Sequence, residues 1–417
     1  MYSKSTRLAA ACAVSVFVSA IGVNALSDDD PFADIDFVRV DQRVDPVPLS
    51  IWGFDVQPRV DFSGGYTSNL FATEINETGS SLLGFAPGLD INSQWAKHGL
   101  SARFLIDHAE NAENTDERHT DLLMSLDGYI DLGEGSQLSG FFVGEIETED
   151  RTEFSAISTA LKPNEYSRLA GGLGFTHAAG AWDLDGDLAY SIFDHDDAVI
   201  LDDLFQDQDF RDRDELTGRF RLAHPVGSNW SAYGEVEHIQ TTFDPPGFFN
   251  AFNRDYGGST VSVGSTFAVG DTVKGDIGFG FMRYVYDDPF FQDIEDIAVS
   301  GNVNWLLASN TSLETEVSRA VIDPGIIQTI AAIETGLDVK LVHGVTPRVF
   351  LIGGAGVNTY EFENIDRTDD RIDLSLGANW RVNKNLWLES QVEYLDASSP
   401  VQPFTDNRVM IRMRVFP

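Results

Sequence analysis

The sequence is short of cysteine, of basic residues and of long apolar runs, and each shortage excludes a class of protein. Its one cysteine, Cys12, lies close to the N-terminus, so a framework of disulfides is excluded. Lysine and arginine total 28 against 66 aspartates and glutamates, and the formal net charge is −38. Nucleic acid is therefore excluded as a partner, because phosphate backbones require a basic surface. After residue 25 no apolar run approaches the roughly 20 residues of a membrane-spanning helix.

The first 25 residues differ from the rest of the chain. Lys4 and Arg7 precede an apolar run that ends at Val23, and Ala25 is followed by SDDD. This pattern predicts a signal peptide spanning residues 1–25, cleaved after Ala25. Lipidation of Cys12 is the less favoured alternative, because three alanines precede it instead of the expected leucine. Residues 26–50, which include DDDPFADIDFVRVDQRVDPVPL, lack a clear strand pattern and predict a periplasmic lead-in or a partial plug.

The remainder, residues 51–417, alternates between apolar and polar side chains. In FDVQPRVDFSGGY, Phe54, Val56 and Phe62 share one parity, while Asp55 and Asp61 share the other. A period of two predicts a strand with one apolar and one polar face. Similar segments lie near 54–66, 82–96, 100–108, 120–131, 137–147, 165–176, 182–193, 212–223, 230–242, 258–269, 273–286, 296–307, 312–322, 327–343, 348–360, 371–381, 386–395 and 407–416. Most are near the roughly 9–11 residues that a tilted strand needs to cross a bilayer.

The connections between these segments alternate in length. Short ones such as AKHG at 96–99 and VNKN at 382–385 alternate with longer acidic ones such as 108–119, 148–164 and 194–214. Short periplasmic turns and long external loops are typical of outer-membrane barrels. The sequence thus predicts an all-β fold, a transmembrane antiparallel up-and-down β-barrel of about 18 strands. An array of soluble β-sandwiches is the less favoured alternative.

The tryptophans support the membrane interpretation, because they gather near the short turns. An indole prefers the membrane interface, with its ring in lipid and its N–H near water. Trp387 is near a short turn as well, but it has the opposite parity. The predicted interfacial girdle consists of Trp52, Trp95, Trp182, Trp230, Trp305 and Trp380.

Three aspartates in WDLDGDLAYSIFD, Asp183, Asp185 and Asp187, raise the question of a calcium-binding loop. An EF-hand would need glycine at its sixth position and glutamate at its twelfth, and neither is present. Their alternation with apolar residues instead predicts that they point into the lumen. The full predicted pore lining is Asp55, Arg59, Asp61, Asp90, Arg103, Asp107, Asp127, Glu145, Asp183, Asp185, Asp187, Glu215, Arg219, Arg221, Glu235, Glu237, Lys274, Asp276, Glu314, Glu316, Asp373, Arg381, Glu389, Glu393, Arg412 and Arg414. Since acids outnumber bases, we expect a bias towards cations and neutral sugars; the alternative for each charge is simple hydration of the wall.

Two kinds of loop invite functional hypotheses. The acidic run 194–214 suggests divalent-cation binding, but it lacks metal-ligand spacing and a solvated surface is favoured. The loops FDPPGFFNAFNRDY and YDDPFFQD predict either a sugar-stacking platform or a constriction, or else rings that only pack on each other. Their aromatic residues are Phe248, Phe249, Phe252, Phe290 and Phe291.

Catalysis has little support in the sequence, and we expect no enzyme, no metal centre and no cofactor. The eight histidines are scattered, and neither HExxH nor GxSxG occurs. An outer-membrane phospholipase would need a Ser–His pair on the lipid-facing wall, and His238 is the nearest candidate.

Residues 48–73, PLSIWGFDVQPRVDFSGGYTSNLFAT, resemble the opening of the putative β-barrel porin 2 family: an apolar lead-in, a first strand, then Tyr-x-x-Asn-Leu-Phe. Residues 84–107, GFAPGLDINSQWAKHGLSARFLID, are similar to its second and third strands. The resemblance implies an outer-membrane protein of Gram-negative bacteria associated with surface exopolysaccharide. One departure is the C-terminus, because Pro417 follows Phe416, and Phe416 is out of register with the lipid-facing residues of the last strand.

These observations predict a porin-like channel of the cell outer membrane for passive transport, with a link to exopolysaccharide export implied by the resemblance. The alternative is a closed structural or assembly barrel that conducts nothing. The expected partners are outer-membrane lipid and lipopolysaccharide, the barrel-insertion machinery and, from the resemblance, polysaccharide-export components.

Overall fold

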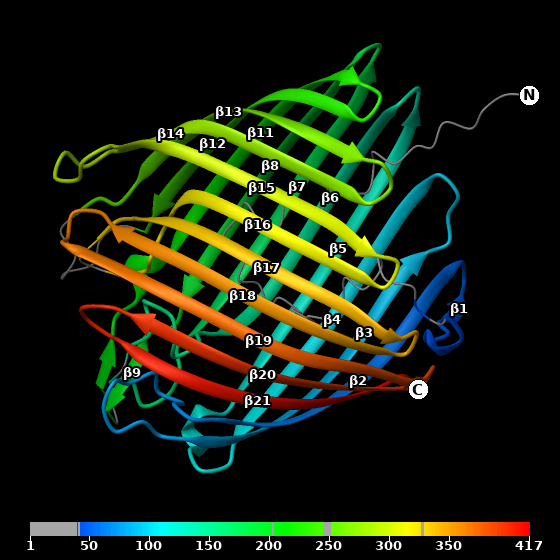
Figure 1. The fold of residues 1–417 in the computed structure, drawn as a ribbon. Helices are drawn as coiled ribbons and strands as arrows, with labels where there is room; N and C mark the ends of the chain where they lie inside the picture. The colour runs from blue at the N-terminus through cyan, green and yellow to red at the C-terminus, as the bar shows by residue number, and fades with distance from the viewer. Residues whose placement is uncertain (1–39, 41, 158, 202–203, 245–251, 327–328) are drawn as a thin grey trace, which may run out of the picture.

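Eighteen antiparallel strands close into a barrel, which confirms the predicted fold class (Figure 1). The computed structural model describes residues 40, 42–157, 159–201, 204–244, 252–326 and 329–417. The predicted signal peptide, residues 26–39 of the lead-in, Phe248 and Phe249 lie outside the described residues. No helix among the described residues is long and apolar enough to span a membrane.

Each of the predicted segments coincides with one barrel strand. The barrel strands are β2 (Phe54–Thr67), β3 (Ser80–Ser93), β4 (His98–Asn111), β5 (His119–Gly133), β6 (Ser136–Thr148), β7 (Glu165–Ala179), β8 (Trp182–His195), β11 (Arg213–Gly227), β12 (Trp230–Phe243), β13 (Tyr256–Val269), β14 (Val273–Tyr286), β15 (Ile294–Ala308), β16 (Thr311–Ile322), β17 (Ala332–Thr346), β18 (Val349–Phe362), β19 (Arg367–Asn383), β20 (Leu386–Ser398) and β21 (Phe404–Val415). The largest error in the predicted bounds is at β17, where the segment 327–343 began too early.

A few short elements lie outside the barrel wall and were not predicted. Strand β1 (Leu49–Ile51) pairs with the start of β2, and β9 (Ala198–Leu201) and β10 (Leu204–Gln206) form a separate hairpin. Within the described residues, the 3-10 helices η2 (Gln42–Val44), η3 (Thr115–Glu117) and η4 (Asp209–Arg211) lie in the lead-in and the loops.

Neighbours in the chain are neighbours in the wall, with two exceptions. Strand β8 pairs with β11, which skips the hairpin, and β21 pairs with β2, which closes the ring. Residues 134–135 and 180–181 form short turns at one end, while 68–79 and 112–118 form longer loops at the other. The barrel begins and ends on the short-turn side, as an even number of strands requires.

The turn between β5 and β6 illustrates how the short connections form. Gly133, Glu134 and Gly135 have φ angles of 81°, 51° and 77°. Glycine adopts this left-handed region without steric cost, and two glycines around Glu134 allow the chain to reverse tightly.

The inner face of the wall pairs aromatic rings with glycines. The Tyr233 ring lies across Gly264 and Gly278 on the next two strands, and the Tyr284 ring lies across Gly258. A β-carbon on Gly264 would collide with the Tyr233 ring and with the backbone of Ile277. These rings therefore lie flat against the wall and cover the strand positions that have no side chain.

Pro87, in β3, interrupts the ladder between β3 and β4. Strands β3 and β4 pair up to Phe85 and resume at Gly88, so Ala86 and Pro87 have no partner on β4. Proline has no N–H to donate to the ladder, which accounts for the gap.

The lumen is more buried near the long loops than in the middle. Near the long loops, Tyr256, Tyr284, Tyr286 and Ile330 belong to one buried apolar cluster. In the middle, the inward-facing side chain of Arg103 is 42% exposed. A barrel of this strand number is too wide for side chains to fill, which explains the exposed interior.

Candidate functional site

The predicted pore-lining residues lie on the inner face of the wall. On β8, for example, Asp183, Asp185 and Asp187 alternate with Trp182 and Leu188, whose side chains are 46% and 54% exposed on the outer face. The other predicted lining positions follow the same alternation on their own strands. Whether they line a conducting path depends on the two mouths of the barrel.

The structure brings several lining residues together into an ion-pair ladder across β8, β11, β12 and β14. Arg219 contacts Asp187 at 2.6 Å and Glu235 at 3.4 Å. Arg221 contacts Glu235 at 2.6 Å and Asp276 at 2.9 Å. The Arg221 guanidinium also lies 3.9 Å from the centre of the Tyr233 ring, so this wall is held rigidly by charge and by stacking.

A second cluster joins the first and last strands. Arg414 on β21 contacts Asp61 on β2 at 2.9 Å and Glu389 on β20 at 4.0 Å, and Arg412 contacts Glu389 at 3.6 Å. Asp61, Glu389 and Arg414 are buried although they face inward. We conclude that these three lining residues brace the closing seam more than they contact water. Nearby, Arg59 and Arg103 both approach Asp90, at 4.0 and 2.8 Å.

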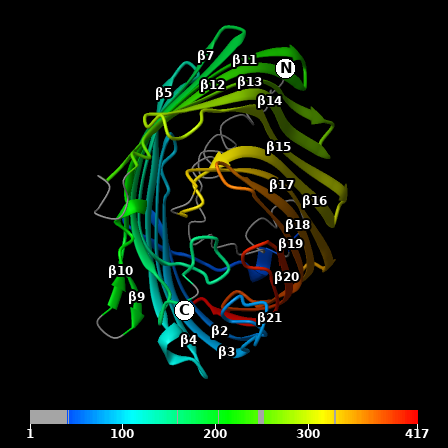
Figure 2. The same cartoon turned by 90° about the vertical axis from the view of Figure 1, so that its left-hand side faces the viewer.

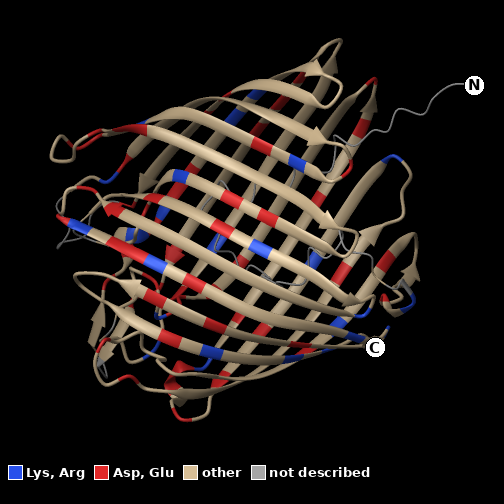
Figure 3. Cartoon of the chain, in the orientation of Figure 1, with Lys and Arg blue, Asp and Glu red and all other residues tan. Residues whose placement is uncertain are grey.

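Other inward carboxylates have no such partner. Across the described residues, Glu314 and Glu316 on β16 and Asp338 on β17 form no ion pair. Asp and Glu are spread along these strands and gather near the long loops (Figure 3). The inner wall is therefore neutralised where arginines occur and has a net negative charge along β16 and β17, although Lys340 lies opposite Glu314.

The long-loop mouth contains a group of buried charges that the sequence did not reveal. The segment 149–157, after β6, contributes the buried Glu149 and Arg151, and the loop after β16 contributes Asp323. Asp150 lies between the first two, but its side chain is 48% exposed. Glu149 contacts Arg211 at 2.7 Å, and Asp323 contacts Arg254 at 3.0 Å. Figure 2, which looks along the barrel, shows both loops inside the ring of strands.

These loop carboxylates have shifted pKa values. Burial alone would raise the pKa of Asp150, but Arg408 and the Thr152 N–H outweigh burial and lower it to about 2. Burial also opposes the charge on Asp323, and Arg254 and Arg213 overcome it and lower its pKa. Glu153 is less well compensated, because burial and the charges of Asp150 and Glu149 exceed the effect of Arg371 and raise its pKa to about 7.

At the short-turn mouth, the end of the lead-in lies against the inner wall. Val40 packs on Val342, Phe350 and Ile352. Val44 is buried, and its carbonyl accepts a hydrogen bond from the Trp387 indole at 3.3 Å. Asp45 contacts Arg381, another predicted lining residue, at 3.2 Å. Val40, Val44 and Asp45 of the lead-in thus lie inside the barrel, whereas Val47 is exposed.

The predicted girdle residues other than Trp52 lie on the outer face, near the short turns. Five of them, Trp95, Trp182, Trp230, Trp305 and Trp380, are 46–49% exposed. Trp52 is 96% exposed and has a φ of 51°, because it lies in the turn between β1 and β2 and not in the barrel strand. Trp387 points inward, where its ring contacts Phe416 with centroids 5.0 Å apart.

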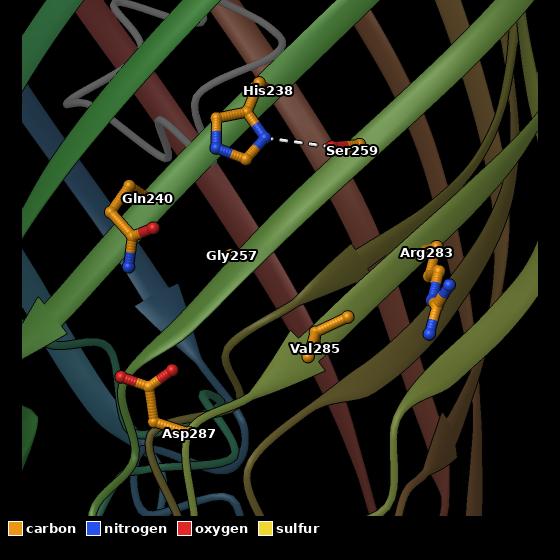
Figure 4. Close-up of a pocket in the computed structure, with 7 residues that line it drawn as sticks. All are labelled: His238, Gln240, Gly257, Ser259, Arg283, Val285 and Asp287. Atoms are coloured by element: carbon orange, nitrogen blue, oxygen red, sulfur yellow. Dashed lines mark hydrogen bonds between the residues drawn. The ribbon is translucent and has the colours of Figure 1, made fainter.

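His238, the candidate for a phospholipase dyad, lies in a polar groove of about 460 Å³ on the outer face of β12–β14 (Figure 4). Its Nδ1 is 2.8 Å from the Ser259 hydroxyl on the neighbouring strand. His108, His177 and His343 also face outward, and each makes the same Nδ1 contact, at 2.8–2.9 Å, with the Ser or Thr directly opposite. This recurrence is typical of cross-strand pairing and not of a unique catalytic dyad.

The structure also shows how the aromatic loop residues and the aspartates of the acidic run are arranged. Phe252, Phe290 and Phe291 pack on each other, with Phe252 and Phe290 stacked at 4.2 Å, as the packing interpretation expected. Within the acidic run 194–214, Asp197, Asp207 and Asp209 place one carboxylate oxygen each within 4.8 Å of the others. All three are exposed, which is common for acidic groups without a metal.

Several solved outer-membrane proteins are similar to this chain at low identity. OpdL of Pseudomonas aeruginosa is 10% identical, with a TM-score of 0.44 and 87% of this chain and 99% of OpdL covered. A BenF-like porin from Pseudomonas fluorescens Pf-5 is 10% identical, with a TM-score of 0.45 and 87% and 99% covered. The FrpB iron transporter of Neisseria meningitidis (F5-1 variant) is 10% identical, with a TM-score of 0.47; the match covers 85% of this chain but only 63% of FrpB.

No curated protein matches this chain in sequence. Residues 44–416 match the family model described as putative beta-barrel porin 2. The match contains both stretches that resembled this family and extends through all barrel strands. The chain belongs to the putative β-barrel porin 2 family.

Proposed function

We propose that the protein is a passive, porin-like channel of the outer membrane whose lumen favours cations and neutral sugars over anions. Membership of a porin family supports a channel, implies an outer-membrane location and points away from an enzyme. The finer claim, the selectivity, depends on one observation: lumen arginines such as Arg219 and Arg221 are paired with acids, whereas Glu314, Glu316 and Asp338 form no ion pair among the described residues. A wall with a net negative charge raises the local concentration of cations.

Reversal potentials across a planar bilayer under a KCl gradient test this selectivity. We expect potassium to be preferred, and we expect the triple variant Glu314→Gln, Glu316→Gln, Asp338→Asn to lose most of that preference. Glu295→Gln is a matched control, because Glu295 is an exposed acid on the outer face. A preference for chloride in the unmodified protein would contradict the proposal.

The family resemblance extends the proposal to surface polysaccharide. On that basis alone, we propose that the channel acts with exopolysaccharide-export components, and that its expected neighbours are outer-membrane lipid, lipopolysaccharide and the barrel-insertion machinery. Interruption of the current by added oligosaccharides would support a polysaccharide-compatible lumen. A current unaffected by oligosaccharides would remove that part of the proposal and leave the channel itself in place.

A closed structural barrel is the second candidate, and the buried loops at the long-loop mouth favour it. Arg151 and Glu117, for example, pair at 2.6 Å with almost no exposed surface. A correctly folded protein that gives no current in the bilayer, with or without a voltage, would select this candidate over the channel.

A further inference from the structure

We propose that residues 149–157 form the constriction of the channel, and that Arg371 and Arg408 on the opposite wall hold this segment across the lumen and so set its size limit. The inference rests on the proposed channel function, which it deepens. It depends on contacts that the segment makes on two sides of the mouth.

On one side, the segment contacts neighbouring loops. Glu149 contacts Arg211 at 2.7 Å. The Arg151 guanidinium contacts Glu117 at 2.6 Å and also donates to the carbonyls of Ile157 and Ala160, at 3.0 and 3.1 Å. Arg151 thus ties the segment to a neighbouring loop and also fixes its own turn.

On the other side, the segment contacts β18, β19 and β21, which are distant from β6 in the ring of strands. Asp150 contacts Arg408 on β21 at 3.3 Å, and Arg371 on β19 donates to the Thr152 hydroxyl at 3.2 Å. The Phe154 ring packs on Tyr360 of β18, with centroids 4.6 Å apart. Between β6 and β21 the wall contains β2, β3, β4 and β5, so these contacts require the segment to cross the mouth.

Both arginines are positioned by the wall itself. Arg408 contacts Asp406 on its own strand at 2.7 Å, and Arg371 contacts Asp373 at 3.7 Å. A long side chain that is already oriented loses less entropy when it binds a second partner. The two arginines on the wall are therefore already oriented to bind the segment 149–157.

A second loop braces the crossing segment. Gly325, in the loop after β16, has a φ of 64°, and a β-carbon there would collide with the β-carbon of Ser155 and approach the Arg211 guanidinium. In the same loop, Asp323 contacts Arg254 at 3.0 Å. The two loops thus interlock, and Gly325 permits their close approach.

The crossing segment lies over a part of the lumen that is accessible to solvent. Further from the long-loop end, on the same two strands, Asp373 is 33% exposed and Arg412 is 30% exposed. By contrast, Arg151 and Thr152 in the segment are buried. The Asp150 side chain keeps 48% of its surface exposed, so the segment is partly buried. A partly buried segment over a solvent-accessible lumen is the arrangement expected of a constriction.

The test compares the unmodified protein with Arg371→Gln, Arg408→Gln in two independent measurements. We expect hydrogen exchange of residues 150–157 to become roughly tenfold faster, since charged hydrogen bonds that hold the segment are lost. In a planar bilayer we expect a larger single-channel conductance and entry of larger polyethylene glycols. Arg283→Gln is the control, because it removes one charge from the outer face of β14, away from both the lumen and the segment.

The second variant, Asp150→Asn with Thr152→Val, removes the same contacts from the loop side and leaves the wall intact, in case the arginine variant fails to fold. If hydrogen exchange of residues 150–157 is unchanged in both variants, the claim that Arg371 and Arg408 hold the segment is wrong. Faster exchange with an unchanged conductance and polymer limit would overturn the role in size selection. If hydrogen exchange becomes faster but none of the proteins conducts, the two arginines do hold the segment. The channel function on which the inference rests is then refuted.

Discussion

The closing seam between β2 and β21 should depend on one carboxylate, Asp406. The ladder between these strands extends only from Val60 to Thr67, whereas β2 pairs with β3 along its whole length. Asp406, just beyond the ladder and fully buried, accepts hydrogen bonds from the Thr67 hydroxyl at 2.7 Å and from the Asn69 N–H at 2.9 Å. It therefore extends the seam by side-chain contacts where backbone pairing has ended.

The cost of removing this carboxylate follows from its partners. Ser68 donates to it through both its N–H and its hydroxyl, each at 3.0 Å, and Arg408 contacts it at 2.7 Å. A hydrogen bond to a charged group contributes about 1.5–3 kcal/mol, and breaking a buried charge pair costs about 3–5 kcal/mol. Because such contacts are not additive, we expect Asp406→Ala to lower the free energy of unfolding by about 3–5 kcal/mol in total.

Urea unfolding of the refolded barrel in lipid vesicles, followed by the folded band on a cold gel, measures this free energy. The control is Asp396→Ala on the neighbouring strand, where the partly exposed carboxylate accepts a hydrogen bond from the Tyr394 hydroxyl at 3.1 Å. We expect the control to change stability by less than about 0.5 kcal/mol. If Asp406→Ala stays within about 1 kcal/mol of the unmodified protein, the seam does not depend on this network.

Three further predictions concern the mouth, the membrane interface and the wall. The pKa of Glu153 is raised from 4.5 to about 7, so the protonated side chain favours the segment 149–157 in its place across the mouth. As the pH rises from 5 to 8, the free energy that holds this segment should fall by on the order of 2 kcal/mol. Hydrogen exchange of the segment should show this dependence, and Glu153→Gln should abolish it. Brominated lipids should quench the fluorescence of Trp182 strongly but leave that of Trp387, which points inward, nearly unchanged; equal quenching would contradict the assigned faces. Gly264→Ala should destabilise the barrel by about 1–3 kcal/mol, because the new methyl group would displace the Tyr233 ring, and thermal melting should detect the loss.

The strands could be predicted from the sequence because alternation is a local property. Each strand has one face towards lipid, so an apolar residue at every second position marks it without knowledge of its partners. The contacts between loops and wall could not be predicted in this way. Asp150 and Arg408 are separated by 258 positions, and no short-range pattern indicates that their side chains meet.

Charge pairing within the lumen was equally hidden from the sequence. Alternation placed both Arg414 and Arg103 on the inner face, but it could not show that Arg414 is buried in the seam while Arg103 is 42% exposed. The lead-in shows the same limit, since its sequence permitted a free segment or a partial plug. Only the contacts of Val44 and Asp45 with the inner wall favour the partial plug for its described part.

Both segments inside the barrel are held by the same part of the wall. At the long-loop end, Arg371 on β19 and Arg408 on β21 contact the segment 149–157. At the short-turn end, Arg381 on β19 and Trp387 on β20 contact the lead-in. These strands are the last in the chain, so neither segment can dock until the chain is complete. A mutation that shifts β19 should therefore alter both mouths together, whereas a comparable change on β12 should affect neither.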